Sequence, residues 1–228
     1  MEQLILYLVL FFPNVFSNNY STDFYSTGII QFSLINELGR TLTYTIPSLA
    51  LLWYIILGKI SGARIPAFKE IFYLPELKFS QKRDLCSLLI GLPGLILTGI
   101  VISLLISGLS PDLSMDLPLK VQAPDRILGW IVLVFSCLGT GYLEESFFRY
   151  YLLSSLEINI SKPAIRVIIA AILFSFCHIY EGPWGILNAA LAGILLSVLF
   201  IRYRSIHGIA WAHGAYNLFV YIMGYFTL

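Results

Sequence analysis

The chain has 228 residues, of which 58% are hydrophobic and only 12% are charged, and its mean hydropathy is +0.82. Soluble domains carry about 25% charged residues, so this composition excludes an ordinary soluble domain and predicts an integral membrane protein. The net charge of +1 gives no electrostatic basis for binding nucleic acid. We therefore expect the lipid bilayer to be the main partner of this chain.

A membrane-spanning helix needs about 20 mostly apolar residues. Segments of suitable composition recur along the whole chain, at 3–16, 28–58, 84–109, 126–155, 163–180, 183–203 and 206–227. The predicted fold class is therefore all-α, a polytopic helical membrane protein with about seven transmembrane helices.

The first two segments differ in length. Segment 3–16 is short, and its start, Met1-Glu2-Gln3, lacks the basic residue typical of a signal peptide. We favour a membrane helix that ends at Pro13 and leave a cleaved signal as the alternative. Segment 28–58 is long and carries Glu37 and Arg40, which lie three residues apart on one helical face.

The charges of the connecting loops predict the orientation in the membrane. Loop 59–83 holds six lysines and arginines against two glutamates, whereas loop 110–125 holds three aspartates and one lysine. Because cytoplasmic loops are enriched in Lys and Arg, we expect 59–83, 156–162 and 202–206 to face the cytoplasm. The C-terminus is then expected on the outer side.

Charged residues inside the fourth segment give the main indication of function. A charged side chain at the bilayer centre costs roughly 2.5–3.5 kcal/mol on insertion scales, so such residues are usually functional. Glu145 and Arg149 are four residues apart, with the acid first, which is the favoured order for a helical ion pair. Glu144 points about 100° away from Glu145 on the helix and has no partner there. Glu144 is therefore the candidate general base.

Two later segments carry further polar residues. His178 lies near the end of segment 163–180, and His213 and Asn217 lie one turn apart in the last segment. Counted from the cytoplasmic helix ends at about 1.5 Å per residue, these residues and Glu144 could converge near mid-depth if the helices tilt. We therefore expect a polar intramembrane cavity. Glu144 and His178 could activate a water molecule there, while His213 and Asn217 could donate to an oxyanion.

At these residues the chain resembles a known family. Three motifs with four-residue spacing follow one another on three predicted helices: Glu144-Glu145-x-x-x-Arg149, Phe174-x-x-x-His178 and His213-x-x-x-Asn217. In type, order and helical setting they resemble the motifs of the CPBP intramembrane proteases. That family includes the CAAX prenyl endopeptidases and bacteriocin-processing or self-immunity proteins. The resemblance covers about 126–228.

The resemblance implies a glutamate-dependent endopeptidase that cleaves a membrane-associated peptide or protein. By resemblance, Glu144 would activate water together with His178, and His213 and Asn217 would stabilise the tetrahedral oxyanion. Glu145 and Arg149 would organise the site. We therefore expect one integrated domain with two parts. Residues 1–125 would form N-terminal membrane helices with the basic cytoplasmic loop 59–83, and 126–228 a catalytic four-helix core.

Several alternatives stay open at this point. Glu144, His178 and His213 could ligate zinc, but the sequence has no HExxH motif, and we expect neither a metal nor another cofactor. A proton-coupled transporter also places acids and histidines at mid-depth, and a family member can bind a peptide without cleaving it. The substrate, whether a prenylated CAAX tail, a leader peptide or a sorting tag, and the oligomeric state stay open. We expect a multi-pass protein of the prokaryotic cell (inner) membrane.

Overall fold

The computed structural model describes residues 2–17, 29–30, 32–61, 74–109, 120–121 and 124–226. The all-α prediction is confirmed, because helices form nearly all of the regular structure in these ranges. The longer helices are α1 (Glu2–Ser17), α4 (Ile46–Ser61), α5 (Gln81–Leu109), α6 (Ile127–Glu145), α8 (Pro163–Phe176), α9 (Gly182–Tyr203) and α10 (Ile206–Phe226).

Shorter elements extend or connect these helices. One π-helical segment joins α3 to α4 and a second joins α6 to α7, so that each pair forms one longer rod. Two strands of two residues each pair in parallel, with Ile29 opposite Lys120. The bounds are α3 (Leu34–Arg40), a π-helix (Thr41–Thr45), a second π-helix (Ser146–Leu152), α7 (Leu153–Glu157), a 3₁₀ turn (Ile179–Glu181), β1 (Ile29–Ile30) and β2 (Lys120–Val121).

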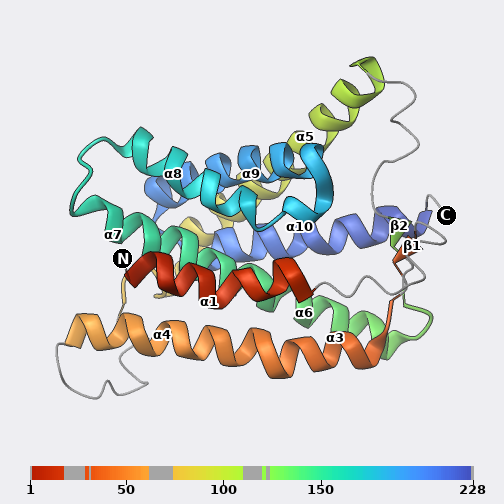
Figure 1. Cartoon of the computed structure of the whole chain (residues 1–228), viewed down its shortest axis with the longest axis horizontal. Helices are drawn as coiled ribbons and strands as arrows, with labels where there is room; N and C mark the ends of the chain where they lie inside the picture. Colours follow the sequence, from red (N-terminus) through yellow and green to blue (C-terminus); the bar gives the residue numbers. More distant parts are fainter. Residues whose placement is uncertain are drawn as a thin grey trace.

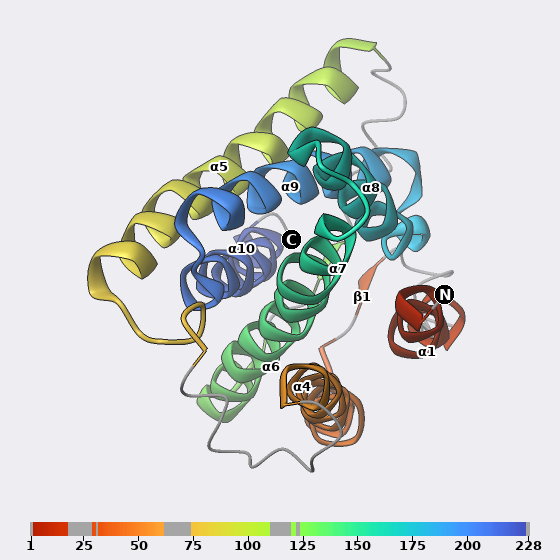
Figure 2. The same ribbon diagram turned by 90° about the vertical axis from the view of Figure 1, so that its left-hand side faces the viewer.

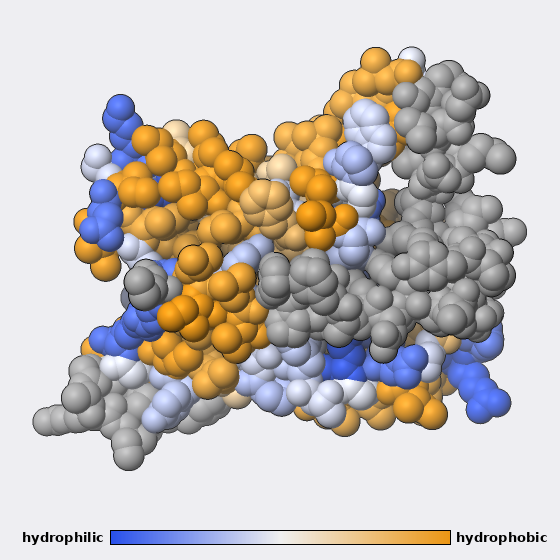
Figure 3. Space-filling view, in the orientation of Figure 1, coloured by the Kyte–Doolittle hydropathy of each residue, from blue (hydrophilic) through white to orange (hydrophobic). Residues whose placement is uncertain are grey.

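The structure supports an integral membrane protein. Four helical segments of the described chain are long and apolar enough to cross a bilayer: Leu34–Ile60, Gln81–Leu109, Ile127–Glu157 and Ile179–Tyr203. Glu2–Phe11 and Pro163–Phe176 are apolar but shorter. Many large apolar side chains lie on the outside of the helices, such as Leu104 of α5 at 67% exposure. Figure 3 shows the broad hydrophobic surface that results and that a bilayer would cover.

The rod formed by α6 and α7 lies at the centre of the helical bundle (Figures 1 and 2). Helix α10 packs along one side of α6, and α3 and α4 pack along another. Helix α5 packs against α9 and α10, and α8 packs against α9. The central position of α6 is what lets residues at its end meet side chains from several other helices.

Two glycines bring α6 and α10 unusually close together. A Cβ atom on Gly141 would lie 2.8 Å from the carbonyl oxygen of Ala210, and one on Gly214 would lie 2.9 Å from the Cα of Leu138. Both distances are too short for any larger residue, so the two backbones touch, as small residues allow in membrane bundles. This approach places the end of α6 beside the middle of α10.

Helix α1 packs against the π-helix that follows α6. The Phe11 ring lies 5.1 Å from the rings of both Phe147 and Phe148, measured between centroids. The hydroxyl of Tyr7 donates a hydrogen bond of 2.9 Å to the carbonyl oxygen of Leu173 in α8. Helix α1 therefore contributes to the same aromatic core as the two helices that carry the first two motifs.

Two predicted helix boundaries are wrong at the N-terminal side. Helix α1 does not end at Pro13 but continues to Ser17, because an internal proline removes only one backbone hydrogen bond and apolar helices tolerate this. The second helical rod begins at Leu34, whereas the prediction began at 28. Ser33 caps it, since its Oγ accepts a hydrogen bond from the backbone N–H of Asn36 at 3.4 Å.

The predicted helix 163–180 is also too long. Helix α8 ends at Phe176, because the N–H groups of Cys177 and His178 turn to the carbonyls of Phe174 and Ser175, at 3.1 and 3.0 Å. Gly182, with a φ of 78°, then starts α9. His178 therefore lies in a tight turn between helices, not on a helix as predicted.

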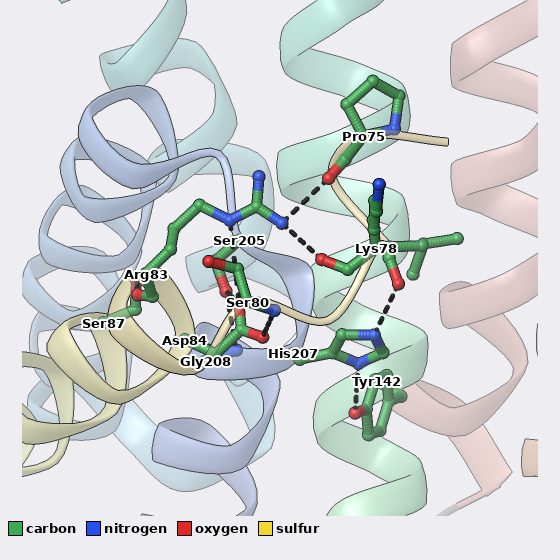
Figure 4. Close-up of polar contacts among 11 residues, drawn as sticks. Pro75, Lys78, Ser80, Arg83, Asp84, Ser87, Tyr142, Ser205, His207 and Gly208 are labelled. Carbon is green, nitrogen blue, oxygen red and sulfur yellow. Dashed lines mark hydrogen bonds and ion pairs between the residues drawn. The ribbon is translucent and has the colours of Figure 1, made fainter. Parts of the chain in front are cut away.

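A cluster of hydrogen-bonded polar residues joins the C-terminal end of loop 59–83 to the helical bundle. Residues 62–73 of that loop lie outside the described residues, as do most residues of loop 110–125. At its described end, Asp84 is fully buried and accepts hydrogen bonds from Ser205 Oγ at 2.6 Å and from the backbone N–H of Ser80 at 2.8 Å. Ser205 Oγ in turn accepts from the N–H of Gly208 at 2.9 Å (Figure 4).

His207 extends this cluster to α6. Its Nε2 lies 2.8 Å from the carbonyl oxygen of Leu77, and its Nδ1 lies 2.7 Å from the hydroxyl of Tyr142 (Figure 4). A carbonyl oxygen only accepts, so Nε2 carries the proton and Tyr142 donates to Nδ1. We call Asp84, Ser205, His207 and Tyr142 the anchor cluster. It joins loop residues 74–80 to α5, α6 and α10.

Candidate active site

The first motif lies where α6 changes from an α-helix to a π-helix. Glu144 and Glu145 close α6, and Arg149 lies inside the π-helix, a rare geometry that recurs at functional sites. Glu145 Oε2 lies 3.1 Å from Arg149 Nε, and the two side chains are 0% and 1% exposed. The predicted ion pair of Glu145 with Arg149 is therefore present, and it is fully buried.

His213 of α10 lies between the two glutamates. Its Nδ1 is 2.7 Å from Glu145 Oε1, and its Nε2 is 3.5 Å from Glu144 Oε2. The His213 side chain is 7% exposed and that of Glu144 is 15% exposed. Arg149, Glu145, His213 and Glu144 thus form one row, which we call the acid–histidine cluster.

The geometry of this cluster constrains where its protons lie. The carboxylate of Glu145 accepts a hydrogen bond from Nδ1, so in a neutral His213 the other nitrogen, Nε2, is an acceptor. A carboxylate of Glu144 facing that acceptor at 3.5 Å would be repelled. One proton shared between Glu144 and His213 relieves this repulsion, either on the glutamic acid or on an imidazolium. The pair therefore suits proton transfer.

Phe174 connects the second motif to this cluster. Its ring is 2% exposed and lies 4.8 Å from the His178 ring and 5.8 Å from the His213 ring, between centroids. The guanidinium of Arg149 lies 4.5 Å from the centre of the same ring, which is a cation–π contact. One aromatic side chain therefore touches both histidines and the buried arginine.

The hydrogen bond of His178 sets its tautomer. Its Nδ1 lies 3.1 Å from the carbonyl oxygen of Phe174, which only accepts, so Nδ1 carries the proton. In the neutral ring Nε2 then keeps its lone pair and can accept a proton. The tight turn after α8 is what allows this bond, because the ring folds back over its own last helical turn.

The structure adds contacts that the sequence interpretation did not include. Glu144 Oε2 lies 3.5 Å from Nε2 of His213, and the proposed joint action of Glu144 and His178 on water stays a prediction. His178 meets the cluster through the ring of Phe174. Asn217 lies one turn after His213 and is partly buried, and no group of the described residues hydrogen-bonds to its side chain. The catalytic roles of these residues stay predictions.

Several buried polar atoms of the cluster have no hydrogen-bond partner among the described residues. They are Oε2 of Glu144 and of Glu145, Oγ of Ser146 and the three guanidinium nitrogens of Arg149. The 3.1 Å contact of Arg149 with Glu145 is thus a charge contact without hydrogen-bond alignment. Such atoms are rare in folded proteins and mark places where a further polar group can bind. The polar cavity predicted around them stays a prediction.

Some supporting residues were not found from the sequence. Phe174 belongs to the second motif of the sequence, but its central position between the two histidines was not predicted. Nothing in the sequence indicated that α6 and α10 meet at Gly141 and Gly214, because glycine is frequent in membrane helices. The position of Tyr7 in α1 was also not predicted, because the first 125 residues carry no motif. The hydroxyl of Tyr7 lies 3.6 Å from Sγ of Cys177, the residue before His178.

Among the described residues, no group of three or more His, Cys, Asp or Glu side chains has a metal-binding arrangement. Glu145 is occupied by Arg149 and His213, which leaves Glu144, His213 and His178 as the nearest candidates. The expectation that catalysis needs no metal stays a prediction.

Comparison with known proteins agrees with the resemblance seen in the motifs. Residues 126–219, somewhat less than half of the chain, match the family model described as type II CAAX prenyl endopeptidase Rce1-like. Comparisons with curated proteins and with solved structures gave no match. The matched part contains the whole acid–histidine cluster, His178 and Asn217. Over this part, the match supports a CPBP family intramembrane protease.

Proposed function

We propose that this protein is an intramembrane endopeptidase in which Glu144 and His178 activate water and His213 and Asn217 stabilise the oxyanion. The family match supports a CAAX-type protease in general terms. The observation that carries the finer proposal is the position of His213 between the carboxylates of Glu144 and Glu145. A histidine held on one side by a buried acid and facing a second acid on the other is oriented for acid–base chemistry.

The proposed reaction is hydrolysis of a peptide bond by one water molecule. Glu144 removes a proton from the water, whose oxygen attacks the peptide carbonyl, and the lone pair of His178 Nε2 accepts a hydrogen bond that orients the water. His213 in its imidazolium form donates from Nε2–H to the oxyanion, as does the amide of Asn217, while Glu144 is the unprotonated carboxylate. The proton held by Glu144 then passes to the leaving amine, so that the products are one carboxylic acid and one amine.

Glu145 and Arg149 have a positioning role in this proposal. Glu145 fixes the ring of His213 through the 2.7 Å hydrogen bond at Nδ1, and the buried guanidinium of Arg149 balances the charge of Glu145. The arrangement follows the general rule that an acid behind a histidine sets its orientation and tautomer. Neither residue needs to touch the substrate.

We further propose that about seven helices form a multi-pass bundle around a polar cavity in a prokaryotic cell membrane. Loops 59–83, 156–162 and 202–206 would face the cytoplasm, as their basic residues indicate. The substrate would be a membrane-associated peptide or protein that reaches Glu144 between the helices.

The test is a comparison of purified wild-type protein with Glu144→Gln and His178→Ala in detergent, using a peptide library and mass spectrometry. We expect cleavage rates to fall by about 10² to 10⁴, the usual contribution of an acid–base group. Glu2→Gln is the matched control, because the ion pair of Glu2 with Lys59 is half-exposed and such pairs contribute little.

Identical products from wild type and both variants would refute the protease proposal. Equal loss of activity in Glu2→Gln would show that the assay reports folding and not chemistry. Chelator treatment belongs in the same assay, since inhibition that zinc reverses would replace metal-free catalysis by a zinc mechanism.

A further inference from the structure

A small hollow lies at the end of the bundle away from the acid–histidine cluster, between α7, the start of α8 and the end of α9. It has a cavity volume of about 40 Å³ and is partly open to the surroundings, and its lining combines charged and apolar side chains, among them Glu157, Arg166, Phe200 and Arg204. None of these residues belongs to the three motifs of the proposed protease site. The hollow therefore calls for a separate explanation.

Arg166 is buried in the wall of this hollow. The residue is 8% exposed, its Nη1 lies 2.8 Å from Glu157 Oε1, and its Nε has no hydrogen-bond partner among the described residues. Arg204 Nη2 lies 3.8 Å from the other oxygen of Glu157, and its side chain is 46% exposed. Two guanidinium groups thus share one carboxylate, so the hollow has a net charge of +1 with donors left over.

The backbone of Arg204 is an independent sign of a specific role. Its φ of 50° is the only positive value at a non-glycine residue in the described part of the chain. It ends α9 in the left-handed conformation that glycine or asparagine usually adopts at this position. An arginine here accepts backbone strain that glycine would avoid, and its guanidinium lies over the Phe200 ring at 5.6 Å, beside the hollow.

An apolar outer surface adjoins the hollow, because the exposed side chain of Ile201 is part of both. Isoleucines and a valine at three- or four-residue spacing follow α8 and α9 away from it, each at least 38% exposed: Ile165, Ile168, Ile172, Ile194, Val198 and Ile201. Figure 3 shows hydrophobic surface over this part of the bundle, with hydrophilic side chains at its left-hand end. Cationic groups at the helix ends and apolar stripes along the helices match the two parts of a phospholipid.

We propose that this hollow binds the phosphate group of an anionic phospholipid, with its acyl chains along α8 and α9. Guanidinium groups pair with phosphate oxygens through two parallel hydrogen bonds, which a lysine cannot make. Glu157 holds Arg166 in position, while Arg204, at 3.8 Å from Glu157, is free to turn its donors to the phosphate. Basic pockets between helices on the cytoplasmic side are typical sites for anionic headgroups.

The test uses the full chain in detergent and native mass spectrometry with phosphatidylglycerol or phosphatidylcholine. We expect the wild type to retain one phosphatidylglycerol, and Arg204→Asn to bind it about fivefold more weakly, the effect of one basic residue at a membrane surface. Asparagine tolerates the left-handed backbone, so this variant should fold. Arg202→Asn is the control with the same charge change at an exposed residue outside the hollow.

Three results would overturn the proposal. Equal binding of phosphatidylcholine would remove the role of the headgroup charge. An equal loss of phosphatidylglycerol binding in Arg202→Asn and Arg204→Asn would mean that the lipid responds to the general surface charge and not to the hollow. Inorganic phosphate that raises the Tm of the wild type as much as phosphatidylglycerol would identify a free phosphate ion as the ligand instead. Arg166→Gln, tested in parallel, should weaken binding by at least as much as Arg204→Asn.

Discussion

Asp84 of the anchor cluster and Glu145 of the acid–histidine cluster are both carboxylates with no exposed side-chain surface, but their surroundings differ. Each oxygen of Asp84 accepts a hydrogen bond, one from Ser205 and one from the backbone of Ser80. Glu145 has an aligned hydrogen bond only at Oε1, from His213, and Oε2 has only the charge contact with Arg149.

The histidines of the two clusters show the same contrast. His207 has one partner that only accepts, the carbonyl of Leu77, and one that can donate, the hydroxyl of Tyr142, so both nitrogens are satisfied without any ionisation. His213 faces a carboxylate at each nitrogen, and a neutral ring has only one N–H, so it cannot donate to both carboxylates at once. A satisfied polar network stabilises a fold, whereas an unsatisfied one retains the capacity to bind or transfer a proton.

The largest effect on stability is expected for Glu145→Gln. The change leaves the buried guanidinium of Arg149 without its countercharge, and breaking a buried ion pair in this way costs about 3–5 kcal/mol. Unfolding in detergent, followed by circular dichroism, measures the loss. The double variant Glu145→Gln with Arg149→Met is the control and should recover part of that loss. A decrease below about 1 kcal/mol would mean that Arg149 is not held by Glu145.

A smaller loss of stability is expected for Asp84→Ala. The variant leaves the donors of Ser205 and Ser80 unpaired in a buried site, which costs about 1–3 kcal/mol. Peptide cleavage per folded molecule should stay within about threefold of wild type, because the anchor cluster does not touch the acid–histidine cluster. Activity and unfolding should be measured on the same preparation. If Asp84→Ala lost as much cleavage activity as Glu144→Gln with little change in stability, the anchor cluster would have a role in catalysis and not only in stability.

The smallest effect is expected for Tyr142→Phe. It removes the hydrogen bond to His207 Nδ1 but keeps the ring, so the free energy of unfolding should fall by about 1 kcal/mol. Since Tyr142 lies only two residues before Glu144, the variant also tests whether the two clusters are coupled through α6. Additive losses of stability in a double variant with Glu145→Gln indicate that the two clusters are separate, and a non-additive result indicates that they are coupled.

The sequence predicted much of the fold and named the candidate site residues, but it did not predict the contacts among them. Hydrophobic runs located the helices because a membrane helix must hide its backbone polar groups within a long apolar segment. Their ends were less accurate, as at Pro13 and at His178, because turns and caps depend on local hydrogen bonds. The Glu145–Arg149 pair was predictable since it lies within one helical turn.

Contacts between helices had no such local signal. The meeting of His213 with both glutamates depends on the close approach of α6 and α10 at Gly141 and Gly214, which only the packed bundle defines. The sequence by itself determined that this is a helical membrane protein with buried acids and histidines, since composition and helical spacing are local properties. The tertiary structure decided which of these side chains touch, because the distances between helices depend on the packing of the whole bundle.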